Sequence, residues 1–424
     1  MASDSRSLFI ASGKASVGSF RSLHAALVAA LLVVPACRRA QDVGNGPYAD
    51  VVATAVPAIE RAVRLKFKTP PRLETRSKEQ VRQFVLGEVQ SPHAQQEIAG
   101  SEAAYKLLGM IPDTMHLQPF LVNLLSEQIV GYYDPKTKVL YVVTGSAKDL
   151  VQVTVTHELV HALQDQYVNL DSVQNATGDN DRQTAAQAVF EGQAVYVQLQ
   201  VMLGSGNVAV TMPGGWDRVR QMIRDNQASM PIFAGAPLVM QETLIFPYLS
   251  GAEFIKTYTD REHGVPYQHM PVSTEQILHP ATAYFGHEDM PLHVRFNAIP
   301  SITHVYDNDL GEFETRLFLY QHLDNQDDAT RGAAGWAGDR YEVFRTATGE
   351  GIAWATAWDS RSDAADFYEL ARKVADLRTK GESGKGRVIR VTTSEIGGRP
   401  MVLYVDAPSA AVADAITLRA VQIQ

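Results

Sequence analysis

Residues 155–167 read VTHELVHALQDQY and contain the run HELVH, in which His157 and His161 flank Glu158. Residues four apart share one face of a helix, so the two imidazoles can bind one zinc ion while Glu158 points at its water. The segment is also strongly apolar, as in a helix that crosses the interior of a domain, through Val151, Val153, Val155, Leu159, Val160 and Leu163. The alternative interpretation is an interior helix with two hydrogen-bonded histidines.

A catalytic zinc ion usually takes three protein ligands and one water, so the motif requires a further ligand from elsewhere. The metzincin scheme is excluded, because Gln164 and Tyr167 occupy the positions of its glycine and its third histidine. Glu191 is the first glutamate after the motif and lies in the run FEGQA, within a second apolar helix predicted for residues 183–203. Burial of its charge is costly without a partner, which favours a metal ligand; a surface-facing or salt-bridged glutamate is the alternative.

Three further residues are candidates for supporting roles. Asp165 follows His161 by one helical turn and is placed to orient a ligand imidazole; a carboxylate at a helix end or on the surface is the alternative. Negative charge on an attacked carbonyl oxygen needs a donor, and His279 and Tyr248 are the candidates. A loop histidine without a catalytic role is the alternative for His279.

The segment after the motif predicts a polar loop over residues 169–183 and then the helix of residues 183–203. A line of small residues on this helix predicts a close approach to a neighbouring helix; its members are Ala185, Ala186, Ala188, Gly192 and Ala194.

The segment before the motif predicts a β-hairpin over residues 131–143, with two β-prone runs around an Asp-Pro-Lys-Thr turn. An edge strand in this position can pair with an extended peptide through backbone hydrogen bonds. A purely structural hairpin is the alternative. Residues 48–128 are predicted to be mainly helical.

The N-terminus predicts export. Three basic residues precede an apolar stretch at residues 25–34, which is shorter than the roughly 20 residues of a transmembrane helix and is typical of a secretory signal. Cys37, the only cysteine, follows Val-Pro-Ala, where a bacterial lipoprotein signal places its lipidated residue. A cut after Ala36 by an ordinary signal peptidase is the alternative. An unpaired exported thiol otherwise lacks an explanation, so a lipid anchor to the membrane is favoured.

Composition bounds the remaining possibilities. The chain has 424 residues, 45% of them hydrophobic and 20% charged, which is enough for a large core and two domains. The formal net charge is −9 and no run rich in Lys and Arg occurs, so nucleic acid is not expected as a partner.

The expected organisation is a lipoprotein-type signal peptide at residues 1–37, a linker at 38–47, a catalytic domain at 48–300 and a C-terminal module at 301–424. The module is predicted to be a small α+β unit that supports the catalytic domain. Its expected elements are a helix at 310–323, strands at 341–345 and 352–358, a helix at 362–380, a hairpin of strands at 387–393 and 400–405, and a last helix at 409–421.

Four runs, HELVHALQDQ, FEGQA, SEQIVGYYDPKTKVLYVV and STEQILHP, together resemble a group of little-characterised exported bacterial zinc metallopeptidases of the gluzincin type, which are peptidase MA-like. The resemblance extends over residues 127–280 and, more faintly, over residues 335–340. It implies a zincin-like catalytic domain that binds Zn²⁺ through His157, His161 and Glu191, with Glu158 as the base. Val195 stands where the thermolysin-type ExxxD pattern has its aspartate, so the chain departs from that subfamily.

The sequence therefore predicts an α+β protein with a zincin-like catalytic domain, mainly helical surroundings and a small α+β C-terminal module. The expected function is zinc-dependent endopeptidase activity on a peptide or protein substrate. The expected location is the cell membrane or outer membrane, as a lipoprotein that faces the periplasm or the extracellular space. The alternatives are a catalytically inactive zincin-fold binding protein of the cell envelope and a zinc hydrolase of a non-peptide bond.

Overall fold

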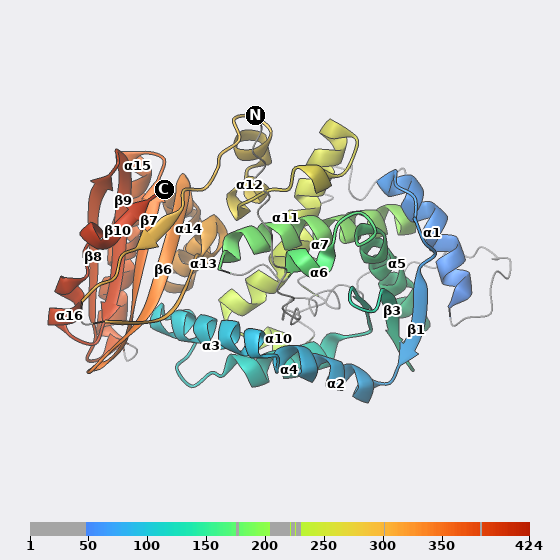
Figure 1. Cartoon of the computed structure of the whole chain (residues 1–424), viewed down its shortest axis with the longest axis horizontal. Coiled ribbons are helices and arrows are strands. Elements are labelled where there is room, and N and C mark those ends of the chain that lie inside the picture. The colour runs from blue at the N-terminus through green and yellow to red at the C-terminus, as the bar shows by residue number, and fades with distance from the viewer. Residues whose placement is uncertain are drawn as a thin grey trace, which may run out of the picture.

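The computed structural model describes residues 48–174, 178–203, 221, 225, 230–300, 302–381 and 384–424. The fold is α+β, as expected, with a small sheet at one end, a larger sheet at the other and long helices between them (Figure 1). The expected signal peptide, the lipidation site Cys37 and the linker lie outside the described residues. Within those residues, no helix has the length and apolar character needed to cross a membrane.

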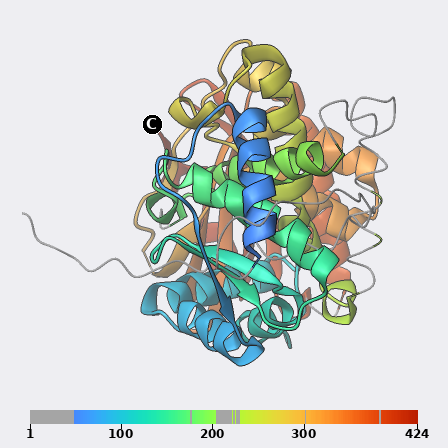
Figure 2. The ribbon, with the colours of Figure 1, turned by 90° about the vertical axis from the view of Figure 1, so that its right-hand side faces the viewer.

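The N-terminal part is mainly helical, as predicted. The chain forms α1 (Ala49–Val63), β1 (Arg72–Arg76), α2 (Lys78–Val89), α3 (Pro92–Leu107) and α4 (Leu117–Gln128). Helix α2 begins with a capping box, in which Ser77 and Gln80 satisfy each other's backbone N–H groups. Helix α1 packs across the helix that carries HELVH, and α2 to α4 lie beyond the small sheet (Figure 2).

The predicted hairpin is confirmed. Strands β2 (Gly131–Asp134) and β3 (Val139–Val143) pair antiparallel, and Asp134 accepts hydrogen bonds from the backbone N–H of Lys136 and the hydroxyl of Thr137 in the turn. Strand β1 pairs parallel with β3 on its other side. The sheet order is therefore β1-β3-β2, which leaves β2 at the edge.

The prediction of a loop over residues 169–183 was partly wrong. HELVH lies in α5 (Lys148–Gln164), which is followed by the short helix α6 (Leu170–Gln174) and by α7 (Asn180–Leu203). Helix α7 begins three residues earlier than predicted, because the Asp179 carboxylate accepts a hydrogen bond from the Arg182 N–H and stabilises the first turn. The polar residues of this segment cap a helix in addition to forming a loop.

The predicted close approach of two helices is confirmed. After α10 (Pro231–Ala234), the long helix α11 (Leu238–Glu262) crosses α7 (Figure 1). An ideal Cβ atom placed on Gly192 would lie 2.0 Å from the backbone carbon of Gly251, and one on Gly251 would lie 2.0 Å from the Ala188 carbonyl oxygen. Only glycine allows this backbone contact, which places the helix turn that carries Glu191.

Several short elements lead to the larger sheet. They are η2 (Pro266–Gln268), α12 (Thr274–Leu278), η3 (Pro280–Tyr284) and β4 (Val294–Phe296). The sheet that follows is antiparallel, with the order β5-β6-β7-β9-β8. Its strands and helices are β5 (Thr303–Asn308), α13 (Gly311–Leu323), α14 (Gln326–Ala333), β6 (Trp336–Thr346), β7 (Gly349–Trp358), α15 (Arg361–Lys380), β8 (Val388–Ile396) and β9 (Arg399–Ala407).

The predicted last helix over residues 409–421 was wrong. The chain instead forms α16 (Ala410–Ala415), the 3-10 turn η5 (Leu418–Ala420) and the strand β10 (Val421–Ile423). Strand β10 pairs antiparallel with β4, so a partner distant in sequence determines its conformation. The other expected elements of the module are present, and β5 and α14 are additional to them.

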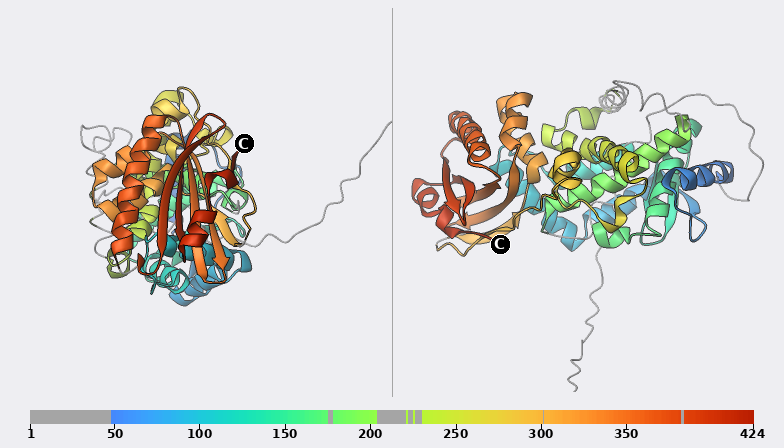
Figure 3. Two further views of the ribbon diagram at one scale, coloured as in Figure 1. Left: turned by 90° about the vertical axis from the view of Figure 1, so that its left-hand side faces the viewer. Right: turned by 90° about the horizontal axis from the view of Figure 1, so that it is seen from above.

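The larger sheet is covered on both faces. Helices α13 to α15 pack on one face, against Trp354, Trp358 and Tyr404, whereas α16, β4 and β10 cover the other (Figure 3). The main apolar core continues from α2 and α3 through α7 and α11 into this sheet. The expected boundary at residue 300 therefore divides the sequence but not the core, and β4 packs with the C-terminal residues.

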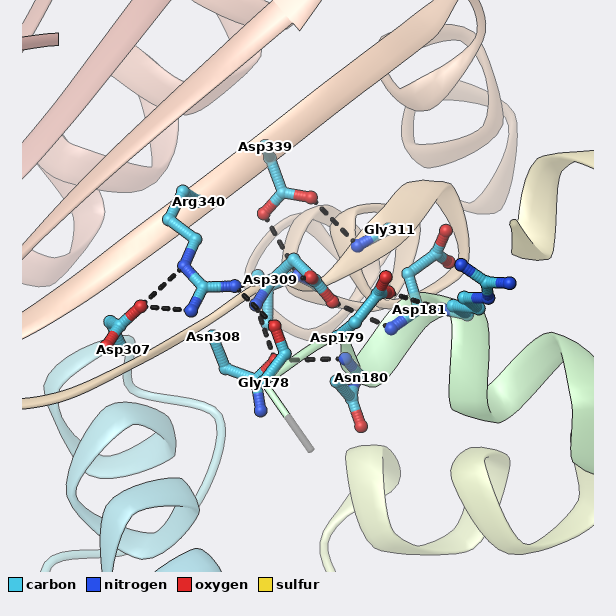
Figure 4. A network of polar contacts seen from close by, with 12 residues as sticks. Gly178, Asp179, Asn180, Asp181, Asp307, Asn308, Asp309, Gly311, Asp339 and Arg340 are labelled. Atoms are coloured by element: carbon cyan, nitrogen blue, oxygen red, sulfur yellow. Dashed lines mark hydrogen bonds and ion pairs between the residues drawn. The ribbon is translucent and has the colours of Figure 1, made fainter. Parts of the chain in front are cut away.

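A polar network joins the start of α7 to the larger sheet (Figure 4). Both Asp339 carboxylate oxygens accept backbone hydrogen bonds, from Leu310 and Gly311 at 3.0 Å each, and they also accept from the indoles of Trp336 and Trp354. Arg340 pairs with Asp307 and donates to the Gly178 carbonyl oxygen. The four partners of the buried Asp339 all lie in the C-terminal part, so Asp339 has a structural role within that part. The link to the start of α7 is made by Arg340 and by Asp309, which accepts a hydrogen bond from the Asp181 N–H.

The structure predicts how acid destabilises the C-terminal part. His322 Nε2 lies 2.9 Å from the Leu108 carbonyl oxygen, and burial, reinforced by the positive charge of Arg378, lowers the His322 pKa to about 4. The unfolded pKa is about 6.5, so the unfolded state takes up the proton first as the pH falls. Stability that is fully present above pH 6.5 is therefore lost as the pH falls toward 4.

We expect His322→Gln, which keeps a donor for Leu108, to reduce the loss of unfolding free energy between pH 7 and pH 4.5 by about 2 kcal/mol. Urea unfolding at both pH values measures the difference. An equal loss in the variant and in the unchanged protein would show that His322 does not carry this pH dependence.

Candidate metal centre

Helices α5 and α7 bring the predicted ligands together in the interior. His157, Glu158 and His161 on α5 are 1%, 0% and 5% exposed, and Glu191 on α7 is 7% exposed. Helix α5 is buried on almost all sides, in agreement with its apolar sequence around the motif. The residues that the sequence nominated as ligands therefore form one buried group.

Three potential ligand atoms converge on one point. His157 Nε2 and His161 Nε2 lie 3.2 Å apart, and Glu191 Oε2 lies 3.2 Å from the first and 3.3 Å from the second. Atoms bound tetrahedrally to zinc at about 2.0–2.1 Å are about 3.3–3.4 Å apart. The three separations fit one zinc ion without movement of the side chains.

Two glutamines orient the imidazoles. Gln164 Oε1 lies 2.7 Å from His161 Nδ1, and Gln198 Oε1 lies 3.2 Å from His157 Nδ1. Gln164 is itself held, since its amide group donates to the Phe190 carbonyl oxygen and to Gln193. Its oxygen must therefore face His161, so Nδ1 carries a proton and Nε2 can present a lone pair to a metal.

The charges of the group suit a cation. Burial raises the pKa of Glu191, but the neighbouring imidazoles outweigh it and hold the pKa below its ordinary value, so the carboxylate is charged at neutral pH. Burial lowers the pKa of His157 and favours its neutral form. Burial also lowers the pKa of His161, but the charge and the hydrogen bond of Glu191 outweigh burial and raise this pKa to about 9. A metal would displace the proton from this imidazole.

Glu158 lies beside the ligand atoms with one free oxygen. Its Oε2 accepts a hydrogen bond of 2.8 Å from the backbone N–H of Tyr133 on β2. Its Oε1 is buried and has no hydrogen-bond partner within the described part of the chain. Burial, partly offset by His161 and reinforced by Glu191, raises the pKa of Glu158 to about 8. A carboxylate with such a pKa is suited to accept and return a proton near neutral pH.

Tyr248 on α11 reaches the same site. Its ring centroid lies 6.2 Å from that of His157, and its side chain is completely buried. Burial and the negative charges of Glu191 and Glu158 raise its pKa well above the ordinary value, so the phenol is neutral. Its hydroxyl interacts with the Glu191 carboxylate, although no acceptor among the described residues meets full hydrogen-bond geometry. The hydroxyl is therefore a donor directed at the candidate metal centre.

The structure places Asp165 and His279 in other contacts. Asp165 accepts hydrogen bonds of 2.7 Å from the Tyr133 hydroxyl and from Lys138, whereas the imidazole Nδ1 atoms face glutamines. The expected orienting role of Asp165 therefore belongs to Gln164 and Gln198. His279 Nε2 pairs with Glu312 at 2.8 Å, which lends no support to a role as a transition-state donor.

Sequence reasoning missed Gln164, Gln198 and the backbone of Tyr133. Gln164 follows His161 by three residues and Gln198 follows Glu191 by seven, which are spacings that return to the same face of a helix. Polar residues at these positions in apolar helices could therefore have indicated partners for the two imidazoles. The Tyr133 N–H carries no side-chain signal, and only the position of β2 beside α5 reveals its contact.

Comparison with known proteins leaves the centre unassigned. Residues 301–421 match a family described as a domain of unknown function (DUF8575), and this range contains the whole five-stranded sheet. No curated protein and no solved structure matches the chain. The residues of the candidate metal centre lie outside the matched range.

Proposed function

We propose that this protein is a zinc-dependent endopeptidase of the gluzincin type. The observation that carries the proposal is the convergence of His157, His161 and Glu191 at separations suited to tetrahedral zinc, beside the free carboxylate oxygen of Glu158. Export and lipid attachment through Cys37 stay predictions from the sequence.

Each residue of the site has a distinct task in peptide hydrolysis. Bound zinc would polarise the scissile carbonyl and lower the pKa of a water. Glu158 Oε1 accepts a proton from that water and returns it to the leaving amine, while the Tyr133 N–H holds the other oxygen in place. The buried, neutral Tyr248 hydroxyl donates to the negative charge that develops on the carbonyl oxygen.

Strand β2 is the proposed site for the substrate backbone. It forms one edge of its sheet, and the Tyr133 N–H points away from β3 and is already bound to Glu158, so the groups left for a substrate on this edge are the others that face outward. In an antiparallel pair, the N–H and C=O groups of one residue point the same way, so the Tyr133 carbonyl also faces outward. An extended peptide paired with this edge would lie next to the proposed base.

The burial of the site favours one alternative, a zincin-fold binding protein without catalytic turnover. All four residues of strand β2 are buried, and so are the side chains of His157, His161 and Glu191. A substrate must therefore displace part of the surrounding structure to reach Glu158. This alternative predicts stoichiometric zinc without cleavage.

Metal analysis combined with a cleavage assay distinguishes the two functions. We expect one zinc per chain and cleavage of casein or a peptide library that a chelator abolishes and added zinc restores. Stoichiometric zinc with no cleavage would favour the binding protein. Absence of zinc after loading would contradict both functions.

The glutamine contacts predict a graded effect on zinc binding. Gln198→Leu removes the acceptor for His157 Nδ1, and loss of such a contact typically weakens metal affinity about 10- to 100-fold. Zinc competition with a chromophoric chelator measures the change. Gln152→Leu, the same substitution at an exposed position of α5, is the control and should leave the affinity unchanged. Equal affinities for both variants would show that Gln198 does not orient the ligand.

A further inference from the structure

A second group of potential ligands lies away from the candidate metal centre. One carboxylate oxygen from each of Glu275, Asp289 and Asp359 lies within 4.8 Å of the other two. Glu275 is in α12, Asp289 follows η3, and Asp359 comes directly after β7. Glu275 is only 6% exposed, whereas the Asp359 side chain is 38% exposed. The group is therefore closed on one side and open to water on the other.

Glu275 is a buried acid without a partner. Among the described residues, no hydrogen bond or ion pair involves its carboxylate. Its helix neighbour Gln276 uses its own side chain for the Val272 N–H and the Asp289 carbonyl oxygen and offers nothing to Glu275. A buried carboxylate with no partner is costly, so its position requires an explanation.

The surroundings of Glu275 add negative charge. Burial and the charges of Glu312 and Asp289 raise the Glu275 pKa to about 9. One oxygen of Glu312 and one of Asp181 are also buried without a hydrogen-bond partner within the described part of the chain. The nearest cation in contact is Arg399, 3.4 Å from Asp359 and half exposed at the rim. The group thus lacks positive charge where its buried oxygens converge.

We propose that Glu275, Asp289 and Asp359 bind one calcium ion. Oxygen-only ligands suit a hard cation, and calcium accepts carboxylates together with several waters at about 2.3–2.6 Å. Two oxygens bound to one such ion are at most about 5 Å apart, and the three carboxylate oxygens lie within 4.8 Å of one another, so all three can reach the same ion. The open side leaves room for the waters. The ion would link α12 to the end of β7 in the larger sheet. Helix α12 itself packs on α7.

The test uses the full zinc-loaded chain and calcium chloride alone. Isothermal titration should find one saturable site, and saturating calcium should raise the unfolding temperature by about 2–4 °C. Magnesium at the same concentration should give a smaller shift, because it retains its waters and requires near-octahedral ligands. No saturable calcium binding, or an equal response to magnesium, would overturn the proposal.

Glu275→Gln provides the decisive variant. It keeps the shape of the side chain and removes the cost of protonating Glu275 in the calcium-free fold, so its unfolding temperature without calcium should equal or exceed that of the unchanged protein. Its calcium response should be lost, whereas Asp376→Asn, on the exposed side of α15, should retain it. A calcium response that persists in Glu275→Gln would contradict the site. Zinc content should be unaffected, so this outcome is independent of the proposed peptidase function.

Discussion

A Glu158→Gln variant is expected to keep one zinc per chain and to lose peptide hydrolysis by about 100- to 10,000-fold in kcat/KM. The amide has the shape of the carboxylate and can still accept the hydrogen bond from the Tyr133 N–H through its oxygen. It cannot take a proton from water, however. Zinc analysis and turnover of a fluorogenic peptide measure the two properties separately.

The matched control is Glu369→Gln, the same substitution on the exposed surface of α15, where the side chain is 59% exposed and pairs with Lys373. It should leave zinc content and turnover unchanged. A Glu158→Gln variant with full activity would refute the assignment of the base. A variant that lost zinc would instead place Glu158 among the ligands.

The second large effect is expected from Gly192→Ala. Alanine normally stabilises a helix interior relative to glycine by up to about 1 kcal/mol. Here the added Cβ would lie 2.0 Å from the Gly251 backbone carbon, which no side-chain rotation can relieve. We expect a loss of about 3 kcal/mol or more in unfolding free energy. Separation of α7 from α11 should also move Glu191 and weaken zinc binding.

Gly87→Ala tests the same exchange without the contact. Gly87 lies in α2, and nothing stands within 4 Å of a Cβ placed there. This variant should be more stable by up to about 1 kcal/mol and should bind zinc normally. Denaturant unfolding and zinc competition compare the two variants. If Gly192→Ala were as stable as Gly87→Ala, the close contact between α7 and α11 would not determine the position of Glu191.

Local patterns predicted much of the secondary structure around the site. The apolar residues around HELVH predicted a buried helix, the turn at Asp134 predicted the hairpin, and the small residues of α7 predicted a close contact with a neighbouring helix. Each of these patterns lies within a short stretch of the chain, whereas the identity of that neighbour, α11, does not follow from any of them. The prediction of a last helix was wrong because β10 pairs with β4, and no local sequence pattern indicates that these two segments meet.

The sequence by itself determined which side chains can serve as ligands and base, because spacing along a helix places His157, Glu158 and His161 on neighbouring positions of one surface. It also nominated Glu191 by its charge in an apolar helix. Only the tertiary structure decided that Gln164 and Gln198 orient the imidazoles, that the Tyr133 N–H binds Glu158 and that Tyr248 reaches the same site. These contacts join separate elements, so helix packing and strand position set their distances.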